Sequence, residues 1–495
     1  MAGFGSKSSM ELRLRPRPSS PQPLGGGGPD LISALPDDLL LLVLARLPCA
    51  GAAARTGVLS RRWRGLWARL RRIVLRDVPF HSLQPALASF PRPPPAVSLL
   101  EIRLPEPQPA DIARVNSLLR AAALLDPEEF FLVSPSDLVL SRHFHGHDLN
   151  LPCFHRATSI VLDLHSPVHS FDSYPIIRSL PAGIEFPALE TLSMSSCVVD
   201  DSATLLSRCP RLRTLRLTVV DFNRSVLSFN SPTLEELDVV ATWLNRVNII
   251  APMLKRSTIS LNTNNEQAVS ISISAPMVEK LSWDCYFSKN SSLFGLWRLL
   301  KLSLQAAKRQ GKPPSLQIHA CIESPPIYFY QGARFAQAIE KRLIAAFSVL
   351  ELNLENKGHA YGAFVCHVLE VNQICWAMQS LKVDLRRLAM EEEGCPPDCL
   401  CQPTDWKSQT IPLTALEEVE VSGFHGKDHE FDFLKLILRS APMLKRMTIK
   451  LSREASTSNG GCTKVYDIFK EYSSVLCNVY LSSGSMHGSR NCAST

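Results

Sequence analysis

The sequence predicts an α/β fold in which a small N-terminal helical unit is followed by a solenoid of short repeats. Apolar residues between 30 and 70 recur with the spacing of amphipathic helices. A proline-led apolar motif then recurs every 20 to 24 residues between Pro187 and Pro276. The composition, 45% hydrophobic and 20% charged, is that of a folded chain long enough to bury a sizeable core.

Composition and charge exclude several classes of protein. The chain of 495 residues has a net charge of +7, but residues 1 to 76 hold 13 basic and four acidic residues. A nucleic-acid surface along the whole chain is therefore not expected. No apolar run approaches the roughly 20 residues that span a bilayer, so no membrane partner is expected. Scattered cysteines and no signal peptide predict reduced thiols and a location in the nucleus, the cytoplasm or both.

The N-terminal region divides into a tail and a helical unit. Residues 1 to 29, rich in Gly, Pro, Ser and Arg, predict a disordered basic tail. A helix is predicted to begin at Pro36 and to end near Pro48. A second helix is predicted from Ser60, because four apolar residues then fall on one helical face: Trp63, Leu66, Trp67 and Leu70. So small a unit cannot cover all these residues, so the next domain or a partner protein must cover them.

Several short motifs occur in order between residues 35 and 67: Leu35-Pro36-Asp37-Asp38-Leu39, Val43-Leu44, Leu47-Pro48, Arg55-Thr56, Val58 to Arg64, and Leu66-Trp67. Together they resemble a plant-type F-box, except that Gly57 stands where such proteins usually carry Ser or Cys. The resemblance implies docking on a Skp-family adaptor through an apolar set: Leu35, Pro36, Leu39, Val43, Leu44, Leu47, Val58, Leu59 and Trp63. An ordinary helical cap on the solenoid is the alternative.

Repeats dominate the middle of the chain. Prolines crowd residues 91 to 110 and predict an irregular connection there. Beyond it, five consecutive copies of Pro-x-apolar-x-x-(apolar or small)-x-apolar begin at Pro187, Pro210, Pro232, Pro252 and Pro276, and a sixth begins at Pro442. Repeats of this length and pattern are the leucine-rich-repeat signature, with one strand per repeat lining a horseshoe. Turns and short helices are expected on the convex side.

Within each predicted strand, apolar residues alternate with residues that must face the other way. Stacked repeats bring the middle members of this second set into one row, about 4.8 Å apart per step. We expect this concave row to bind the target protein: Ser193, Arg216, Asp238, Thr258 and Ser282. The alternative is that Arg216 and Asp238 simply pair across neighbouring strands on a solvated face.

The C-terminal third has a recognisable order of motifs, with Leu416 to Val421, Gly423 to Gly426 and Ala441 to Ile449 in succession. This resembles the FBD region that closes many plant F-box/leucine-rich-repeat proteins. Polar residues then predict loose chain over 453 to 461 and 482 to 495. The expected division is a tail (1–29), an F-box (30–70), a connecting region with the first irregular repeats (71–150), a repeat solenoid (151–390), an FBD-like region (391–452) and a partly disordered C-terminal segment (453–495).

Two clusters could hold a metal, but neither has a favourable spacing. The C-x3-C-x-C set differs from a zinc-finger pair, so metal-free thiols in a loop are expected at Cys395, Cys399 and Cys401. A His-x-His-x-His set could bind a divalent ion from one face of a strand, but polar neighbours predict a loop at His143, His145 and His147. Nucleotide-binding and hydrolase motifs are missing from the sequence. No catalytic residue, metal or cofactor is therefore expected.

The family resemblance implies a function. Such proteins serve as substrate-recognition subunits of SCF-type cullin-RING ubiquitin ligases, in which the F-box docks on a Skp-family adaptor and through it on cullin. The repeats would then hold a target protein, whose identity the sequence does not reveal, near the enzymes that modify it. The chain itself would be noncatalytic. The alternative is a leucine-rich-repeat scaffold that binds protein outside a ubiquitin ligase.

Overall fold

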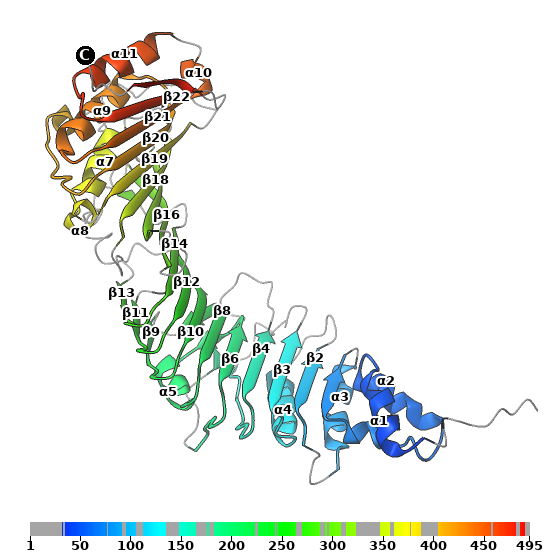
Figure 1. The fold of residues 1–495 in the computed structure, drawn as a ribbon. Coiled ribbons are helices and arrows are strands. Elements are labelled where there is room, and N and C mark those ends of the chain that lie inside the picture. The colour runs from blue at the N-terminus through cyan, green and yellow to red at the C-terminus, as the bar shows by residue number, and fades with distance from the viewer. Residues whose placement is uncertain are drawn as a thin grey trace, which may run out of the picture.

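The computed structural model is a long arc of strands with helices at both ends (Figure 1). It describes Ile32 and residues 35–490 outside gaps at 77, 92–95, 105–111, 135–147, 165–175, 178–182, 223–225, 243, 245, 264–269, 288–292, 295–296, 308–312, 323–346, 357–360, 377, 388–403, 457–458 and 482–485. The predicted α/β class, a helical unit followed by a repeat solenoid, is confirmed.

The N-terminal unit is built from short helices: α1 (Asp37–Ala45), α2 (Ala50–Arg55), η1 (Thr56–Val58) and η2 (Leu66–Arg69). The predicted helix from Ser60 does not form. Residues 61–65 are turns, and Gly65 has a φ of +82°, a left-handed conformation that ends any α-helix there. The apolar spacing was still informative, because Trp63, Leu66 and Leu70 are buried together.

Four parallel strands and two helices follow: β1 (Arg72–Leu75), α3 (Phe80–Ala88), β2 (Leu99–Arg103), α4 (Ile112–Ala123), β3 (Glu129–Ser134) and β4 (Ser159–Leu164). Strand β2 corrects the prediction of an irregular connection over residues 91 to 110. The prolines there flank an apolar stretch and leave Leu99–Arg103 free of proline, so it can pair on both sides.

The repeats form strands in constant phase. Each strand begins four residues after its motif proline: β6 (Thr191–Ser195), β8 (Thr214–Phe222), β10 (Glu236–Thr242), β12 (Arg256–Thr263) and β14 (Lys280–Phe287). Neighbours pair in parallel and in register. The sixth motif copy gives β21 (Arg446–Leu451) at the same offset.

The convex side departs from expectation, because several repeats return through strands rather than helices. The convex elements are β5 (Ile176–Ile177), β7 (Val198–Val199), α5 (Ser202–Ser207), β9 (Val226–Asn230), β11 (Arg246–Ile250) and β13 (Ser270–Ser274). The last three form a separate parallel sheet. A strand of five residues spans about 17 Å, whereas a helix of five residues spans about 8 Å. A strand therefore crosses the convex side with fewer residues, which suits repeats as short as these.

The sheet reverses direction once in its middle. Strand β16 (Trp297–Ala307) runs antiparallel to both β14 and β17 (Ser315–Ile322), and the short β15 (Leu293–Phe294) pairs with it. Parallel pairing then resumes through β18 (Val349–Asn356), β19 (Ser380–Arg387), β20 (Glu418–Phe424), β21 and β22 (Leu476–Tyr480). In Figure 1 the arc turns near this reversal.

Helices return at the C-terminal end: α7 (Gly362–Leu369), α8 (Asn372–Cys375), η6 (Thr404–Lys407), α9 (Asp428–Ser440), α10 (Arg453–Ser456) and α11 (Asn459–Lys470). The antiparallel β23 (Met486–Arg490) closes the sheet. The loose chain predicted over 453 to 461 is therefore wrong where that stretch is described. Likewise, part of the loose segment predicted over 482 to 495 is strand.

One apolar core runs along the solenoid from Ala50 to Val479, and the N-terminal unit has a second core of its own. Trp67 packs against both cores, and its ring meets that of Phe90 edge-on at 5.0 Å. The helices α3, α4, α7 and α9 contribute buried leucines to the same core as the strands. Most polar side chains of the strands therefore point to the opposite face of the sheet, although Ser257 lies on the core face and is buried.

Candidate functional site

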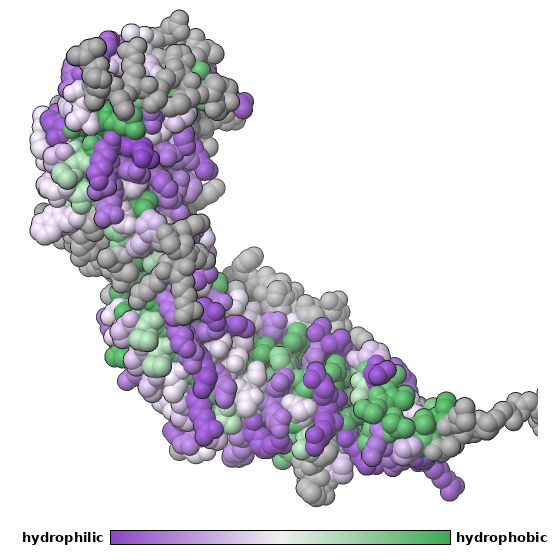
Figure 2. All heavy atoms as spheres, in the orientation of Figure 1, coloured by the Kyte–Doolittle hydropathy of each residue, from purple (hydrophilic) through white to green (hydrophobic). Residues whose placement is uncertain are grey.

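The N-terminal unit exposes large apolar side chains that its own core leaves uncovered. Leu39, Leu42 and Val43 of α1 are 43%, 61% and 48% exposed. Val58 and Leu59, just after α2, are 85% and 67% exposed. Hydrophobic side chains gather at this end of the molecule in Figure 2. We call these five residues the exposed apolar set. Such a concentration is typical of a surface that another protein covers.

The structure divides the residues predicted for adaptor docking. Leu44 and Trp63 are only 1% and 7% exposed and pack with Leu40 in the unit's own core, so they cannot offer a surface to a partner in this conformation. Leu35 and Leu47 are partly buried against that core, and Pro36 is exposed. The remaining predicted residues, Leu39, Val43, Val58 and Leu59, are in the exposed apolar set.

Helical periodicity explains this division and identifies a residue missing from the prediction. On α1, positions 39, 42 and 43 have i, i+3, i+4 spacing and share one face, whereas 40 and 44 share another. Leu42 therefore belongs with Leu39 and Val43.

Asp37 fixes the turn after η1 against the start of α1. Its carboxylate accepts hydrogen bonds from Arg62 at 2.9 Å and from Arg69 at 3.2 Å. The hydrogen bond from Arg62 is the main cause that holds the pKa of Asp37 below its usual value. These two contacts hold Arg62 and Arg69 beside the start of α1, although no continuous helix connects the two arginines.

The predicted concave row exists as a geometric feature. Ser193 is in register with Arg216, Arg216 with Asp238, Asp238 with Thr258, and Thr258 with Ser282. Arg216 and Thr258 are exposed, and the other three are partly exposed. No ion pair joins Arg216 to Asp238, although both side chains are described.

Ion pairs join neighbouring strands of the sheet at several places. Lys255 lies 2.7 Å from Glu235, and Arg256 pairs with Glu236 on the neighbouring strand. Further along the sheet, Lys382 lies 3.2 Å from Glu351. Since these pairs are partly exposed, each contributes about 1 kcal/mol or less to stability.

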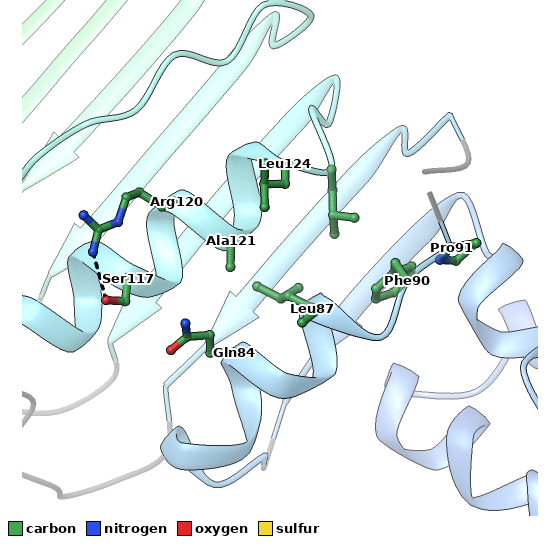
Figure 3. A pocket seen from close by; sticks show the side chains of 10 residues that line it. Gln84, Leu87, Phe90, Pro91, Ser117, Arg120, Ala121 and Leu124 are labelled. Carbon is green, nitrogen blue, oxygen red and sulfur yellow. Dashed lines mark hydrogen bonds between the residues drawn. The ribbon is translucent and has the colours of Figure 1, made fainter. Parts of the chain in front are cut away.

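A small pocket of about 290 Å³ lies between α3 and α4. Figure 3 shows Leu87, Phe90 and Leu124 in its lining, with Ser117 and Arg120 beside them, hydrogen-bonded to each other. Leu87 and Phe90 belong to the solenoid core. The pocket is therefore a gap between two packed helices, with a mostly apolar lining.

Two of the buried cysteines are suited to packing rather than to chemistry. Burial raises the pKa of Cys197 and of Cys209 to about 12, so both thiols are protonated at neutral pH. Among the described residues, no group of three or more His, Cys, Asp or Glu could hold a metal ion. The predicted sets Cys395, Cys399, Cys401 and His143, His145, His147 lie outside the described residues.

Comparison with known families assigns the three parts of the chain. The F-box domain family matches residues 32–75. The leucine-rich repeats of FBD-associated F-box protein At5g56370 match residues 106–292, and the FBD family matches residues 412–449. The chain combines an F-box, leucine-rich repeats and an FBD region. The resemblance drawn from the sequence motifs is thereby confirmed.

Three relatives from Arabidopsis thaliana show the same combination in part. F-box/LRR-repeat protein At3g03360 is 29% identical over 42% of this chain and 43% of its own length. F-box protein At5g03100 is 24% identical over 46% of this chain and 69% of its own length. Putative FBD-associated F-box protein At5g50270 is 26% identical over 43% and 58%. The chain thus matches about half the length of the first and third relatives.

The exposed apolar set lies inside the F-box match, the concave row inside the leucine-rich-repeat match, and α9 inside the FBD match. In the part of the chain that the structure describes, no helix has the length and apolar character needed to cross a membrane.

Proposed function

We propose that this chain is the substrate-recognition subunit of an SCF-type cullin-RING ubiquitin ligase. The F-box docks on a Skp-family adaptor, which links it to cullin, and the concave sheet holds the target protein. The exposed apolar set carries this proposal, because five large apolar side chains stay uncovered on a unit that has already closed its own core. A partner that covers them gains the free energy of removing that surface from water.

The proposed mechanism is proximity. A target held on the sheet keeps its lysines at a high effective concentration near a ubiquitin-carrying enzyme. This chain then contributes binding and geometry, and other subunits perform the covalent steps. The complex would act in the nucleus, the cytoplasm or both.

Two parts of the structure suit this division of labour. The F-box has a core separate from that of the repeats, and Trp67 and Phe90 connect the two at the joint. The exposed apolar set lies on α1 and after α2, away from the strands that carry the concave row. Adaptor and target can therefore bind at the same time.

The test is co-purification of the full-length chain with a Skp-family adaptor. Leu39→Asp and Leu59→Asp each place a charge in the exposed apolar set and should abolish the complex. Leu124→Asp is the matched control, because Leu124 is 63% exposed in the turn just after α4, outside the F-box. Changing Leu35 and Pro36 together to Ala should weaken the complex by on the order of 2 kcal/mol if both contact the adaptor.

The outcomes separate two functions. Adaptor binding that survives both aspartate variants would show that this face is not the docking surface. A wild-type chain that binds no Skp-family adaptor, but does bind other proteins through its repeats, would instead support a leucine-rich-repeat scaffold outside a ubiquitin ligase.

A further inference from the structure

A hollow of about 640 Å³ opens on the polar face of the sheet where the strand direction reverses. We call it the elbow hollow. Its polar lining comes from β12, β14, β16, β17, β18 and β19, and includes Thr258, Lys280, Ser282, Gln305, Ser315 and Lys382. This volume is within the range of about 300 to 1,000 Å³ that is typical of ligand pockets.

The elbow hollow continues the concave row. Ser282 is in register with Gln305 on the antiparallel β16, and Gln305 is in register with Ser315 on β17. Thr258 and Ser282, the last two members of the predicted row, therefore form one polar strip with Gln305 and Ser315 across the reversal. Within the described residues, none of these four side chains has a hydrogen-bond partner, so their hydroxyl and amide groups are open to a ligand.

The charges around this strip are unbalanced. In the row at the start of the strands, Glu236 is followed by Arg256 and then by Lys280. Glu236 pairs with Arg256, so Lys280 is left without a carboxylate partner among the described residues. Lys280 is exposed and lines the hollow.

The acid in the hollow is already neutralised. Glu351 lies 3.2 Å from the ammonium of Lys382 and accepts a hydrogen bond from Gln317 at 2.8 Å. The lining therefore presents one unmatched positive charge, from Lys280, beside a strip of hydrogen-bond donors. A carboxylate is the complementary group, because ionised acceptors make stronger hydrogen bonds than neutral ones.

We propose that the elbow hollow binds the carboxylate of an Asp or Glu side chain on an extended segment of the captured protein, with Lys280 as its ionic partner. The hydroxyls of Thr258, Ser282 and Ser315 and the amide of Gln305 orient that segment. This inference rests on the proposed function, since it assigns a preferred chemistry to the target that the sheet captures. A preformed strip needs little ordering on binding, which favours specificity.

The experiment uses the full-length chain in four forms: wild type, Lys280→Gln, Lys280→Arg and Lys435→Gln. Lys435 is exposed on α9, so its replacement removes the same charge outside the hollow. Each form selects binders from the same random peptide display library. The peptide selected by the wild type is then synthesised with Glu, Gln or phosphoserine at its enriched acidic position.

We expect the wild-type and Lys435→Gln chains to select peptides with Asp or Glu at one fixed position. The Gln version of the peptide should bind about fivefold more weakly or worse. Lys280→Gln should lose the acidic preference, and Lys280→Arg should keep it. Raised salt should weaken the Glu peptide more than the Gln peptide, because screening acts on the ionic contact.

Three results would overturn the proposal. They are an acidic preference that survives in Lys280→Gln, the selection of peptides without an acidic position, and binding of the phosphoserine peptide without binding of the Glu peptide. Adaptor co-purification is measured on the same proteins. If the wild-type chain does not bind the adaptor, the proposed ligase role is wrong. Whether the elbow hollow binds a carboxylate is decided separately, by the peptide measurements.

Discussion

Gly362, the first residue of α7, lies directly against the indole ring of Trp406. A Cβ atom added at position 362 would be 2.4 Å from the nearest ring carbon, which is closer than real side chains approach. The two residues are far apart in sequence, and both are buried, Trp406 as part of the solenoid core. Glycine is thus required at position 362 because the helix and the indole pack without a gap.

We predict that Gly362→Ala destabilises the protein by about 1 to 3 kcal/mol, because the added methyl group overpacks a closed contact. Urea unfolding measures the change in the free energy of unfolding. Gly57→Ala is the matched control, since a Cβ atom there would meet its nearest neighbours at 3.7 Å, an ordinary contact. Equal effects of the two substitutions would show that the Trp406 contact does not constrain position 362.

The F-box core gives a second prediction. Leu44 is 1% exposed, whereas Leu42, two residues earlier on the same helix, is 61% exposed. Leu44→Ala should destabilise the F-box by about 2 to 5 kcal/mol, because it leaves a cavity in the core. Leu42→Ala should leave the free energy of unfolding within about 0.5 kcal/mol of wild type.

Adaptor binding and thermal unfolding together test this assignment. Leu42→Ala should weaken the adaptor complex without lowering the melting temperature. Leu44→Ala should lower the melting temperature first and lose the adaptor only as the F-box unfolds. If Leu42→Ala instead proves the more destabilising of the two, the burial assignment on α1 is wrong.

Local sequence rules predicted the parts of this fold that repeat. The motif proline sets each strand four residues later, and the alternation after it predicts the row from Ser193 to Ser282. The reversal at β16 left no such signal, because no motif proline precedes Trp297–Ala307 at the usual distance. The pattern of apolar residues in a strand also does not indicate in which direction the strand runs. The elbow hollow depends on that reversal, so it could not be predicted either.

The candidate docking residues were predicted less well than the fold, for a physical reason. Apolar character alone does not distinguish a residue that closes the F-box core, such as Trp63, from one that stays exposed, such as Leu59. Periodicity separates them on α1, which is a regular helix. It fails after Ser60, because Gly65 interrupts the helix on which the spacing of Trp63 and Leu66 was interpreted.

A third prediction concerns pH. His429 near the start of α9 packs edge-on against Tyr361, with 5.7 Å between ring centroids. Burial is the main cause that lowers the pKa of His429 below its usual value, and Lys427 and Lys407 add to it, while Glu430 and Asp432 oppose it. The folded state therefore resists protonation, and the unfolded chain takes up a proton more readily. Stability from this residue is fully present above the ordinary imidazole pKa of about 6.5, and it is lost as the pH falls from there through the lower pKa of the folded state.

Urea unfolding at pH 7.5 and at pH 5.5 measures the effect. The wild type should lose more free energy of unfolding between these two values than His429→Gln, which has no imidazole to protonate. Carboxylates titrate in both proteins and cancel in the comparison. An identical pH dependence in the two proteins would contradict the role of His429.

The last prediction addresses the concave row. Arg216 and Asp238 are neighbours in register on β8 and β10, and no ion pair ties them to each other. Their charges are therefore open to a partner, and a target that recognises this row must match both. Arg216→Glu and Asp238→Lys should each impair capture of target proteins, because like charges would then face each other across the interface.

Affinity purification from cells measures this capture. The same purification is made with an F-box-deleted chain, which should capture targets without delivering them to a ligase. Adaptor binding and the melting temperature should stay near wild type, since both side chains lie on the polar face and outside the core. Arg211→Glu is the matched control, because Arg211 is exposed in the turn before β8 and outside the row. If Arg211→Glu impairs capture while the two row variants do not, the target binds at the edge of the repeats rather than on the concave sheet.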